Sequence, residues 1–204
     1  MASPVTIAAV FGQANGYPIT SPIRSRRAHL GRRDMTDTLL ALSTDRCRIA
    51  PLHADDASAF AAITDASVTD QVHFLPAPFT EADARALIAG SGGGDVFHAV
   101  RDRAEGRLQG VVGVHRRDAR EVEVGYWFAA SARGKGLATE AVNAVVREIA
   151  ASRPGAAIVA ECHPGNERSR ALLRRVGFLA TGQIGRRPGR MLMKWRPGPG
   201  IDVC

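Results

Sequence analysis

The chain has 204 residues, of which 45% are hydrophobic, and it carries a formal net charge of +7 at neutral pH. This length suits one buried core, so a single domain is expected, and no apolar run approaches the ~20 residues of a membrane-spanning helix. Aromatic residues make up only 5% of the chain, too few for the stacking platforms of a single-strand nucleic-acid binder, so neither a specific nucleic-acid partner nor a membrane partner is expected.

Cysteine usage indicates a reducing environment. The three cysteines, Cys47, Cys162 and Cys204, are odd in number and have no C-x-x-C spacing, which argues against a zinc site and against a disulfide framework. We therefore expect a cytoplasmic protein without a bound metal.

The first part of the chain is basic and lacks periodicity. Residues 1–33 contain five arginines and no acidic residue, a composition typical of disordered segments and of some organelle transit peptides. A translation start at Met35 is the alternative that we favour. We expect residues 1–43 to precede the domain, residues 44–197 to form it, and residues 198–204 to be a loose tail.

Hydrophobic periodicity predicts strands and helices from Thr44 onward. A two-residue period or a short apolar run indicates a strand, and a 3.6-residue period with polar ends indicates a helix. The expected strands span residues 46–52, 96–101, 108–116, 121–128, 156–162, 178–184 and 190–195, and the expected helices span residues 54–63, 81–89, 137–149 and 166–176.

The connections between these segments indicate the fold class. Short polar or glycine-containing turns separate the strands between residues 96 and 128, so these strands are expected to be antiparallel neighbours. The chain should therefore form an α/β (α+β) domain, with a central mixed, mostly antiparallel sheet of about six to seven strands flanked by helices. A parallel, doubly wound sheet would instead need strands and helices in alternation.

A glycine-rich turn joins the strand at 121–128 to the helix at 137–149. Its sequence, Arg133-Gly134-Lys135-Gly136-Leu137-Ala138, leads into a helix whose first N–H groups have no partner within the helix. These groups and the helix dipole favour an anion, the glycines allow close backbone approach, and Arg133 and Lys135 add positive charge. The expected ligand is a phosphate or pyrophosphate.

Two other phosphate-binding loops match less well. The G-x-x-x-x-G-K-[ST] pattern of nucleotide hydrolases does not occur. Gly134, Gly136 and the acidic Glu161 at the end of the next apolar run give a partial dinucleotide-binding fingerprint, but its third glycine is missing. An NAD(P)-binding Rossmann-type oxidoreductase is therefore the more remote alternative.

Two motif blocks resemble the Gcn5-related N-acetyltransferase (GNAT) superfamily. Arg133, Gly136 and Ala138 match its Q/R-x-x-G-x-G/A loop, which holds the pyrophosphate of acetyl-CoA. Asn166 to Ser169, followed by Gly177-Phe178, resembles the N-x-x-S…G-F pattern of the ribosomal-protein N-terminal (RimJ/RimL-type) acetyltransferase branch. The likeness covers most of the chain.

The resemblance implies the acyl-CoA N-acyltransferase fold, with acetyl-CoA as cosubstrate and no metal. In this family the pantetheine arm lies between two diverging strands, here expected at 122–128 and 156–162, and backbone N–H groups face the thioester. The residues expected to bind the cofactor are Trp127, Phe128, Arg133, Gly134, Lys135, Gly136, Leu137, Ala138, Thr139, Asn166 and Ser169.

Direct acetyl transfer to an amine needs a proton acceptor for the amine and, to a smaller extent, a proton donor for the leaving thiolate. The resemblance implies Glu161 as the base and Ser169 as the acid. Glu123 is the alternative base, Tyr126 a rival acid, and His163 a candidate proton relay. Each of these side chains also has a plain structural explanation as a surface charge, a core residue, an idle loop residue or part of a helix cap.

The acceptor is expected to be a primary amine, either of a peptide N-terminus or of a small molecule. The protein itself is expected to be a monomer or a homodimer. An α-amino group, with a reference pKa of ~7.7–8.0, needs less help to lose its proton than a lysine side chain at ~10.4. His73, Phe74, residues 92–94 and the hairpin tip at 185–189 are expected to shape its pocket. A non-catalytic CoA-binding or CoA-sensing domain on the same fold is the alternative function.

Overall fold

The computed structural model describes residues 41–72, 74–92 and 94–197. The predicted leader up to residue 40, the tail from residue 198, and the predicted pocket residues His73 and Gly93 lie outside the described residues. The strands are β1 (Leu42–Ser43), β2 (Cys47–Pro51), β3 (Asp95–Asp102), β4 (Leu108–Arg116), β5 (Glu121–Phe128), β6 (Ala157–Cys162), β7 (Phe178–Ile184) and β8 (Met191–Trp195). The helices are the 3-10 turns η1 (Ala54–Asp56) and η2 (Ala130–Ala132) and the α-helices α2 (Ala57–Ile63), α3 (Ala66–Thr69), α4 (Glu81–Ala89), α5 (Leu137–Ser152) and α6 (Glu167–Val176).

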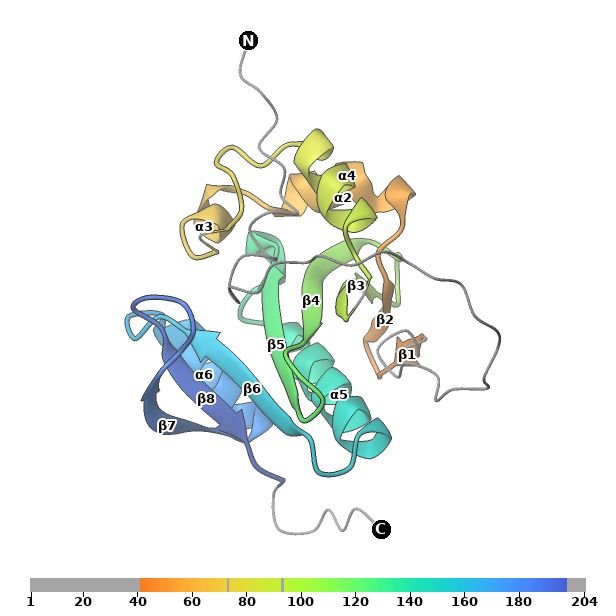
Figure 1. Cartoon of the computed structure of the whole chain (residues 1–204). Coiled ribbons are helices and arrows are strands. Elements are labelled where there is room, and N and C mark those ends of the chain that lie inside the picture. Colours follow the sequence, from red (N-terminus) through yellow and green to blue (C-terminus); the bar gives the residue numbers. More distant parts are fainter. Residues whose placement is uncertain (1–40, 73, 93, 198–204) are drawn as a thin grey trace, which may run out of the picture.

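The strands of the described residues form one sheet in the order β1-β2-β3-β4-β5-β6-β8-β7 (Figure 1). Every neighbouring pair is antiparallel except β5 and β6, which are parallel because α5 connects them by a crossover. The predicted mixed, mostly antiparallel sheet is therefore confirmed. It has eight strands rather than six to seven, because the two residues of β1 are too few to show a period in the sequence.

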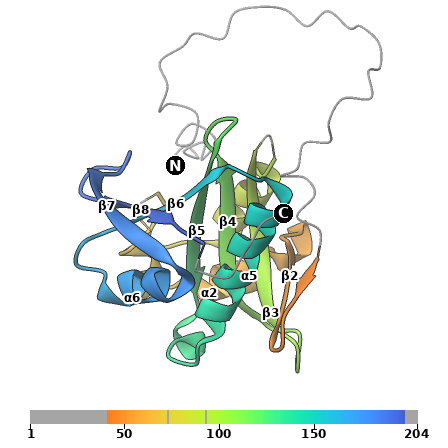
Figure 2. The same cartoon turned by 90° about the horizontal axis from the view of Figure 1, so that it is seen from below.

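Helices cover both faces of the sheet (Figure 2), and the alternation of side chains along β5 shows how. Val122 and Val124 belong to a core shared with α5 and α6, whereas Trp127 points to the other face and packs with residues of α2 and α4. On the first face α5 buries one apolar stripe, formed by Ala141, Val142, Val145, Val146 and Ile149. The two faces of β5 therefore open onto different surroundings.

The parallel pair β5 and β6 diverges soon after it forms. The two strands are in register only from Glu121 opposite Ala157 to Glu123 opposite Val159. β6 then continues beside β8, while β5 stays with β4 up to Phe128 (Figure 1). Within the described residues, the edge of β5 beyond Glu123 that faces β6 has no strand partner. The divergence predicted between these two strands is present.

The close packing of β4 on β5 gives a first testable prediction. Gly110 lies opposite Phe128, and a Cβ at Gly110 would stand 2.3 Å from Cδ1 of the Phe128 ring. We expect Gly110→Ala to lower the free energy of unfolding by about 1–3 kcal/mol, because the ring must shift in a filled core. Urea titration measures this change.

Gly90→Ala is the matched control for this substitution. Gly90 is exposed, has a φ of −80°, and its nearest contact to an added Cβ is an ordinary 3.4 Å. It should change the free energy of unfolding by less than about 0.5 kcal/mol. Equal urea midpoints for the two variants would contradict the packing described here.

Candidate active site

The glycine-rich loop before α5 has the backbone geometry of an anion site. Gly134 and Gly136 are exposed and adopt left-handed conformations, each with a φ of 77°. Gly136 is the N-cap residue of α5, and within the described residues no side chain caps this end of the helix. The N–H groups of Leu137, Ala138 and Thr139 in the first turn, together with the helix dipole, are therefore suited to an anion.

A contact distant in sequence fixes this loop. Glu140, in the first turn of α5, accepts hydrogen bonds from Arg46 Nε at 2.6 Å and from the Arg46 backbone N–H at 2.9 Å. The same guanidinium donates from Nη1 to the carbonyl oxygen of Lys135 at 2.8 Å. The turn before β2 therefore holds both the first turn of α5 and the loop that precedes it.

The two loop cations have different surroundings. Arg133 donates from Nε and Nη2 to the carbonyl oxygen of Phe128, at 3.2 Å each, and from Nη2 to Ser67 Oγ at 2.8 Å. Its guanidinium thus joins the loop to the end of β5 and to the α3 segment, whereas Lys135 is exposed. A phosphate contact of Arg133 stays a prediction.

Trp127 and Phe128, predicted to act through their backbones, bury their side chains on opposite faces of β5. Trp127 donates from Nε1 to Thr64 Oγ1 at 3.2 Å and stacks on Phe60 with ring centroids 5.7 Å apart. Phe128 packs on Gly110 and belongs to the core under α5. Neither side chain reaches the diverging edge of β5, so only backbone groups of these residues are left to face a ligand there.

Tyr126 and Ser169 meet where β5 and α6 approach each other. The two hydroxyl groups are 2.9 Å apart, and the Tyr126 hydroxyl also lies 3.3 Å from the Ser169 carbonyl oxygen. Burial raises the pKa of Tyr126 far above its ordinary value, so the phenol keeps its proton at neutral pH. Asn166 caps α6, because its Oδ1 accepts from the Ser169 N–H at 3.0 Å. The structural role expected of Asn166 is present, and its predicted contact with the cofactor stays a prediction.

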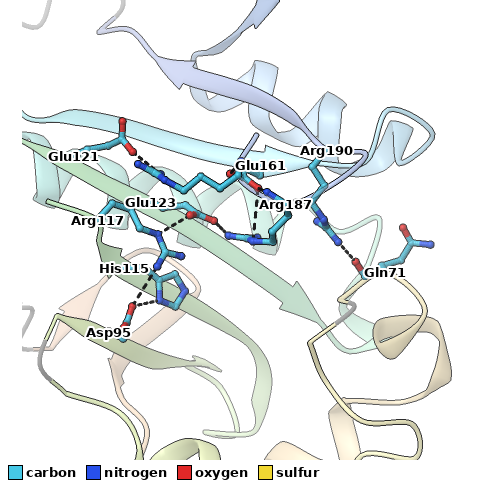
Figure 3. Close-up of polar contacts among 10 residues, drawn as sticks. Gln71, Asp95, His115, Arg117, Glu121, Glu123, Glu161, Arg187 and Arg190 are labelled. Atoms are coloured by element: carbon cyan, nitrogen blue, oxygen red, sulfur yellow. Dashed lines mark hydrogen bonds and ion pairs between the residues drawn. The ribbon is translucent and has the colours of Figure 1, made fainter. Parts of the chain in front are cut away.

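A buried ionic network lies on the other face of the sheet (Figure 3). Glu123 is 1% exposed, and each of its oxygens contacts a different guanidinium, Oε2 that of Arg117 at 2.7 Å and Oε1 that of Arg187. Burial lowers the pKa of Arg187 to about 10, so this side chain is charged at neutral pH. The predicted alternative base, Glu123, therefore has its lone pairs occupied by two cations.

Glu161 holds the tip of the β7–β8 hairpin. Its Oε1 accepts from the Arg186 N–H at 2.6 Å and its Oε2 from the Arg187 N–H at 3.1 Å. The carboxyl group also fills the space above Gly185, where a Cβ would stand 2.5 Å from its carbon atom. These contacts explain Glu161 as an anchor for the hairpin, and its predicted role as general base stays a prediction.

An aspartate–histidine pair that the sequence does not mark lies beside this network. Asp95 and His115 are opposite each other on β3 and β4, and His115 Nδ1 is 2.8 Å from Asp95 Oδ1. His115 is 5% exposed. A single histidine on a strand is most often a core residue, and its partner is identified only when the register of β3 on β4 is known.

The connection between α3 and α4 spans the region between the hairpin and α6. The Gln71 carbonyl oxygen accepts from Arg190 Nη2 (Figure 3). The Gln71 side-chain Oε1 accepts from Asn166 Nδ2 at 3.1 Å. His163, predicted as a proton relay, is exposed, and its Nδ1 accepts from the Gly165 N–H at 3.1 Å. Gln71 thus links three segments near the predicted acceptor pocket, while His163 bonds within its own loop.

The remaining chemically notable groups are buried or dispersed. Cys162 is buried with its Sγ 3.7 Å from Met193 Sδ, and burial raises the pKa of its thiol. Among the described residues, no three His, Cys, Asp or Glu side chains form a cluster that could hold a metal ion. No helix in that part of the chain is long and apolar enough to cross a membrane.

Sequence comparison identifies relatives of the chain. The profile of the family described as "Acetyltransferase (GNAT) domain" matches residues 46–179. YdaF of Bacillus subtilis (strain 168), named as a candidate ribosomal N-acetyltransferase, is 38% identical over 86 residues, which cover 39% of this chain and 44% of that protein. The match thus spans less than half of YdaF.

Structural comparison confirms the predicted fold. A GNAT-family acetyltransferase from Bacillus anthracis superposes with a TM-score of 0.69 at 22% identity, covering 76% of this chain and 97% of that one. Mycobacterium smegmatis RimJ, in complex with CoA-disulfide, superposes with a TM-score of 0.60 at 23% identity, covering 72% of this chain and 80% of that one.

The Asp95–His115 pair predicts how stability depends on pH. Burial, aided by the charges of Arg117 and Arg187, lowers the pKa of His115 against the influence of Asp95. Burial by itself would raise the pKa of Asp95, but the hydrogen bond and charge of His115 and the charge of Arg117 lower it overall. Both groups then bind fewer protons in the folded protein than in the unfolded chain. Their contribution to the free energy of unfolding is complete above about pH 6.5 and is lost as the pH falls below that value.

Urea titrations between about pH 7.5 and about pH 4.5 measure this dependence. The midpoint should fall on acidification, and His115→Gln should remove the part of the fall that begins near pH 6.5. A midpoint that stays constant or rises as the pH is lowered would contradict the assignment.

Proposed function

We propose, since the chain belongs to the GNAT acetyltransferase family, that it is an N-acetyltransferase that transfers the acetyl group of acetyl-CoA directly to a primary amine. The observation that carries the proposal is the uncapped start of α5 beside the divergence of β5 and β6. The start of α5 suits a diphosphate, and the diverging edge of β5 suits an extended arm that lies along a strand. The two features adjoin because η2 and the glycine-rich loop connect the end of β5 to α5.

Different segments of the chain would hold the diphosphate and the pantetheine arm of acetyl-CoA. The N–H groups of Leu137, Ala138 and Thr139 would bind the diphosphate, with Lys135 beside them and Gly136 allowing close approach. The backbone of β5 beyond Glu123 would hold the pantetheine arm. Acetyl-CoA itself supplies an acyl group activated as a thioester.

Direct transfer suits the thiol and hydroxyl groups of this site. Cys162 is buried and its pKa is raised, so it lacks the thiolate character of a nucleophile that would form an acyl-enzyme. Tyr126 and Ser169 share a hydrogen bond at the divergence. They are suited to donate to the departing sulfur, whose pKa of ~8.5 makes full protonation unnecessary.

The acceptor that we propose is the α-amine of a protein N-terminus. YdaF and RimJ bear names of the ribosomal-protein branch, which the motif of Asn166 and Ser169 also resembles. An α-amine is already partly uncharged near neutral pH, with a reference pKa of ~7.7–8.0. Such an acceptor needs only a weak base to lose its proton. This fits a site where the two predicted bases, Glu123 and Glu161, are already bonded to other groups.

The contacts of Glu123 and Glu161 also favour a competing function, that of a CoA-sensing domain. Glu123 contacts two arginines and Glu161 two backbone N–H groups, so neither carboxylate is arranged as a free base. A CoA-sensing domain would bind acetyl-CoA on the same scaffold and transfer nothing. Release of free thiol in the presence of an amine distinguishes the two functions.

The cofactor site is tested by a substitution at the start of α5. Gly136→Asp places a negative charge at the positive end of the helix, so we expect the affinity for acetyl-CoA to fall at least about tenfold. Gly155→Asp is the matched control, because Gly155 also has a left-handed φ, of 84°, in the turn that follows α5. Isothermal titration calorimetry of both variants measures the dissociation constants. Equal affinities would contradict a diphosphate site at Gly136.

The transfer itself is tested with a panel of amines and a free-thiol assay on the full chain. Peptides with free N-termini should release thiol well above the rate of acetyl-CoA hydrolysis, because their α-amines are partly uncharged at neutral pH. The same peptides with acetylated N-termini are the controls and should release none beyond it. Tight binding of acetyl-CoA without thiol release from any amine would favour the sensing function instead.

A further inference from the structure

The turn between β1 and β2 surrounds the carboxylate of Glu140. Glu140 Oε1 accepts from Thr44 Oγ1 at 2.5 Å and from the Arg46 N–H at 2.9 Å, and its Oε2 accepts from Arg46 Nε at 2.6 Å. The turn itself is closed by a hydrogen bond from the Cys47 N–H to Thr44 Oγ1 at 3.0 Å. Both oxygens of Glu140 are therefore bonded to a segment that is 94 to 96 positions away in the sequence.

Glu140 places a negative charge at the start of α5. Its N–H donates to the Gly136 carbonyl oxygen at 3.1 Å, which closes the first turn of the helix. Burial by itself would raise the pKa of Glu140, but the hydrogen bonds from Thr44 and Arg46 and the charge of Arg46 lower it overall, so the carboxyl group is ionised at neutral pH. The helix dipole stabilises a carboxylate in this turn. The same carboxylate would repel a diphosphate bound to the turn.

Arg46 compensates for this charge and also contacts the loop before α5. Its Nη1 donates to the Lys135 carbonyl oxygen at 2.8 Å, and its Nη2 lies 3.4 Å from the position that a Cβ at Gly136 would take. In a trans peptide the C=O and the N–H point in opposite directions, so the bond to Lys135 turns the Gly136 N–H away from Arg46. One guanidinium thus pairs with Glu140 and fixes the orientation of a loop peptide.

The segment after β3 holds the β1–β2 turn in this place. The Arg103 N–H donates to the Arg46 carbonyl oxygen at 2.9 Å, and Arg103 Nη1 donates to the Thr44 carbonyl oxygen at 3.1 Å. The Arg46 side chain itself is 52% exposed. An ion pair with so much exposure contributes little to stability, so removal of the Arg46 side chain should leave the fold intact.

We propose that Arg46 is a positioning residue for acetyl-CoA, which keeps the start of α5 able to bind the diphosphate by pairing with Glu140 and by fixing the peptide between Lys135 and Gly136. The proposal rests on the proposed function, because it assigns a further residue to the diphosphate site of that function. The β1–β2 turn, which lies outside both motif blocks, thereby becomes part of the cofactor site.

Isothermal titration calorimetry on the full chain compares Arg46→Ala with Arg85→Ala. Arg46→Ala retains the Thr44 hydroxyl and the backbone N–H that bind Glu140, so the carboxylate stays beside the loop without its cation. We expect the dissociation constant of acetyl-CoA to rise about tenfold, and the ratio to wild type to shrink in ~1 M salt. Arg85 pairs with Glu81 on α4 at 2.5 Å, so Arg85→Ala removes an equal charge elsewhere and should bind as wild type.

A second substitution separates the effect of charge from a loss of structure. Arg46→Ala combined with Glu140→Gln removes the uncompensated carboxylate, so the affinity for acetyl-CoA should return to within about threefold of wild type. Glu140→Gln alone keeps the cation and an oxygen acceptor, and it should bind acetyl-CoA at least as tightly as wild type. Glu140→Gln decides the matter if Arg46→Ala fails to fold, because weaker binding by this variant would contradict the proposal.

A substrate without a diphosphate gives a further readout. S-acetylpantetheine carries the thioester and the pantetheine arm but no diphosphate. With the peptide that reacts fastest, Arg46→Ala should lower kcat/KM for acetyl-CoA about tenfold and leave kcat/KM for S-acetylpantetheine unchanged. An equal loss with both substrates would indicate a general structural effect and would contradict the proposal.

The outcomes for binding separate this inference from the proposed function. Equal affinities of Arg46→Ala and wild type for acetyl-CoA, or a loss of affinity that Glu140→Gln does not reduce, would overturn the role of Arg46 alone. In both cases the wild type still binds acetyl-CoA, and the proposed function is unaffected. A wild-type protein that does not bind acetyl-CoA would remove the proposed function and this inference together.

Discussion

The separation of β5 from β6 after three residue pairs is the constraint on which the rest of the structure depends. A parallel pair needs a crossover, and the crossover helix α5 brings its first turn next to the end of β5. Because β6 leaves to pair with β8, the edge of β5 is open close to that helix start. In the part of the chain that the structure describes, a helix start suited to an anion and an unpaired strand edge therefore adjoin, and both are formed by the backbone.

The alternation of side chains along β5 divides the site between two faces. Tyr126 points toward α6 and meets Ser169 there, whereas the side chains of Glu123 and Trp127 point toward the opposite face. On that opposite face lie the arginine–carboxylate network and the Asp95–His115 pair (Figure 3). One strand thus separates the Tyr126–Ser169 pair from the arginine–carboxylate network and the Asp95–His115 pair.

Local sequence patterns made most of the helices and strands predictable, but not the side-chain contacts between residues distant in the sequence. The period of α5 and its glycine loop can be read from neighbouring residues. The predicted helices and strands are present with small differences at their ends, such as the end of α5 at Ser152 rather than at residue 149, whereas β1 and η2 were not predicted. The bond between Arg46 and Glu140 joins residues 94 apart, and the pairing of Asp95 with His115 depends on strand register. The family resemblance implies Glu161 as a base, and its contacts with the hairpin N–H groups appear only in three dimensions.

A crystal structure of the protein with coenzyme A bound tests the central claim most directly. The account predicts the diphosphate on the N–H groups of Leu137, Ala138 and Thr139, with the pantetheine arm along β5 between Val124 and Phe128. A diphosphate bound elsewhere on the molecule, or an arm that does not enter between β5 and β6, would contradict it.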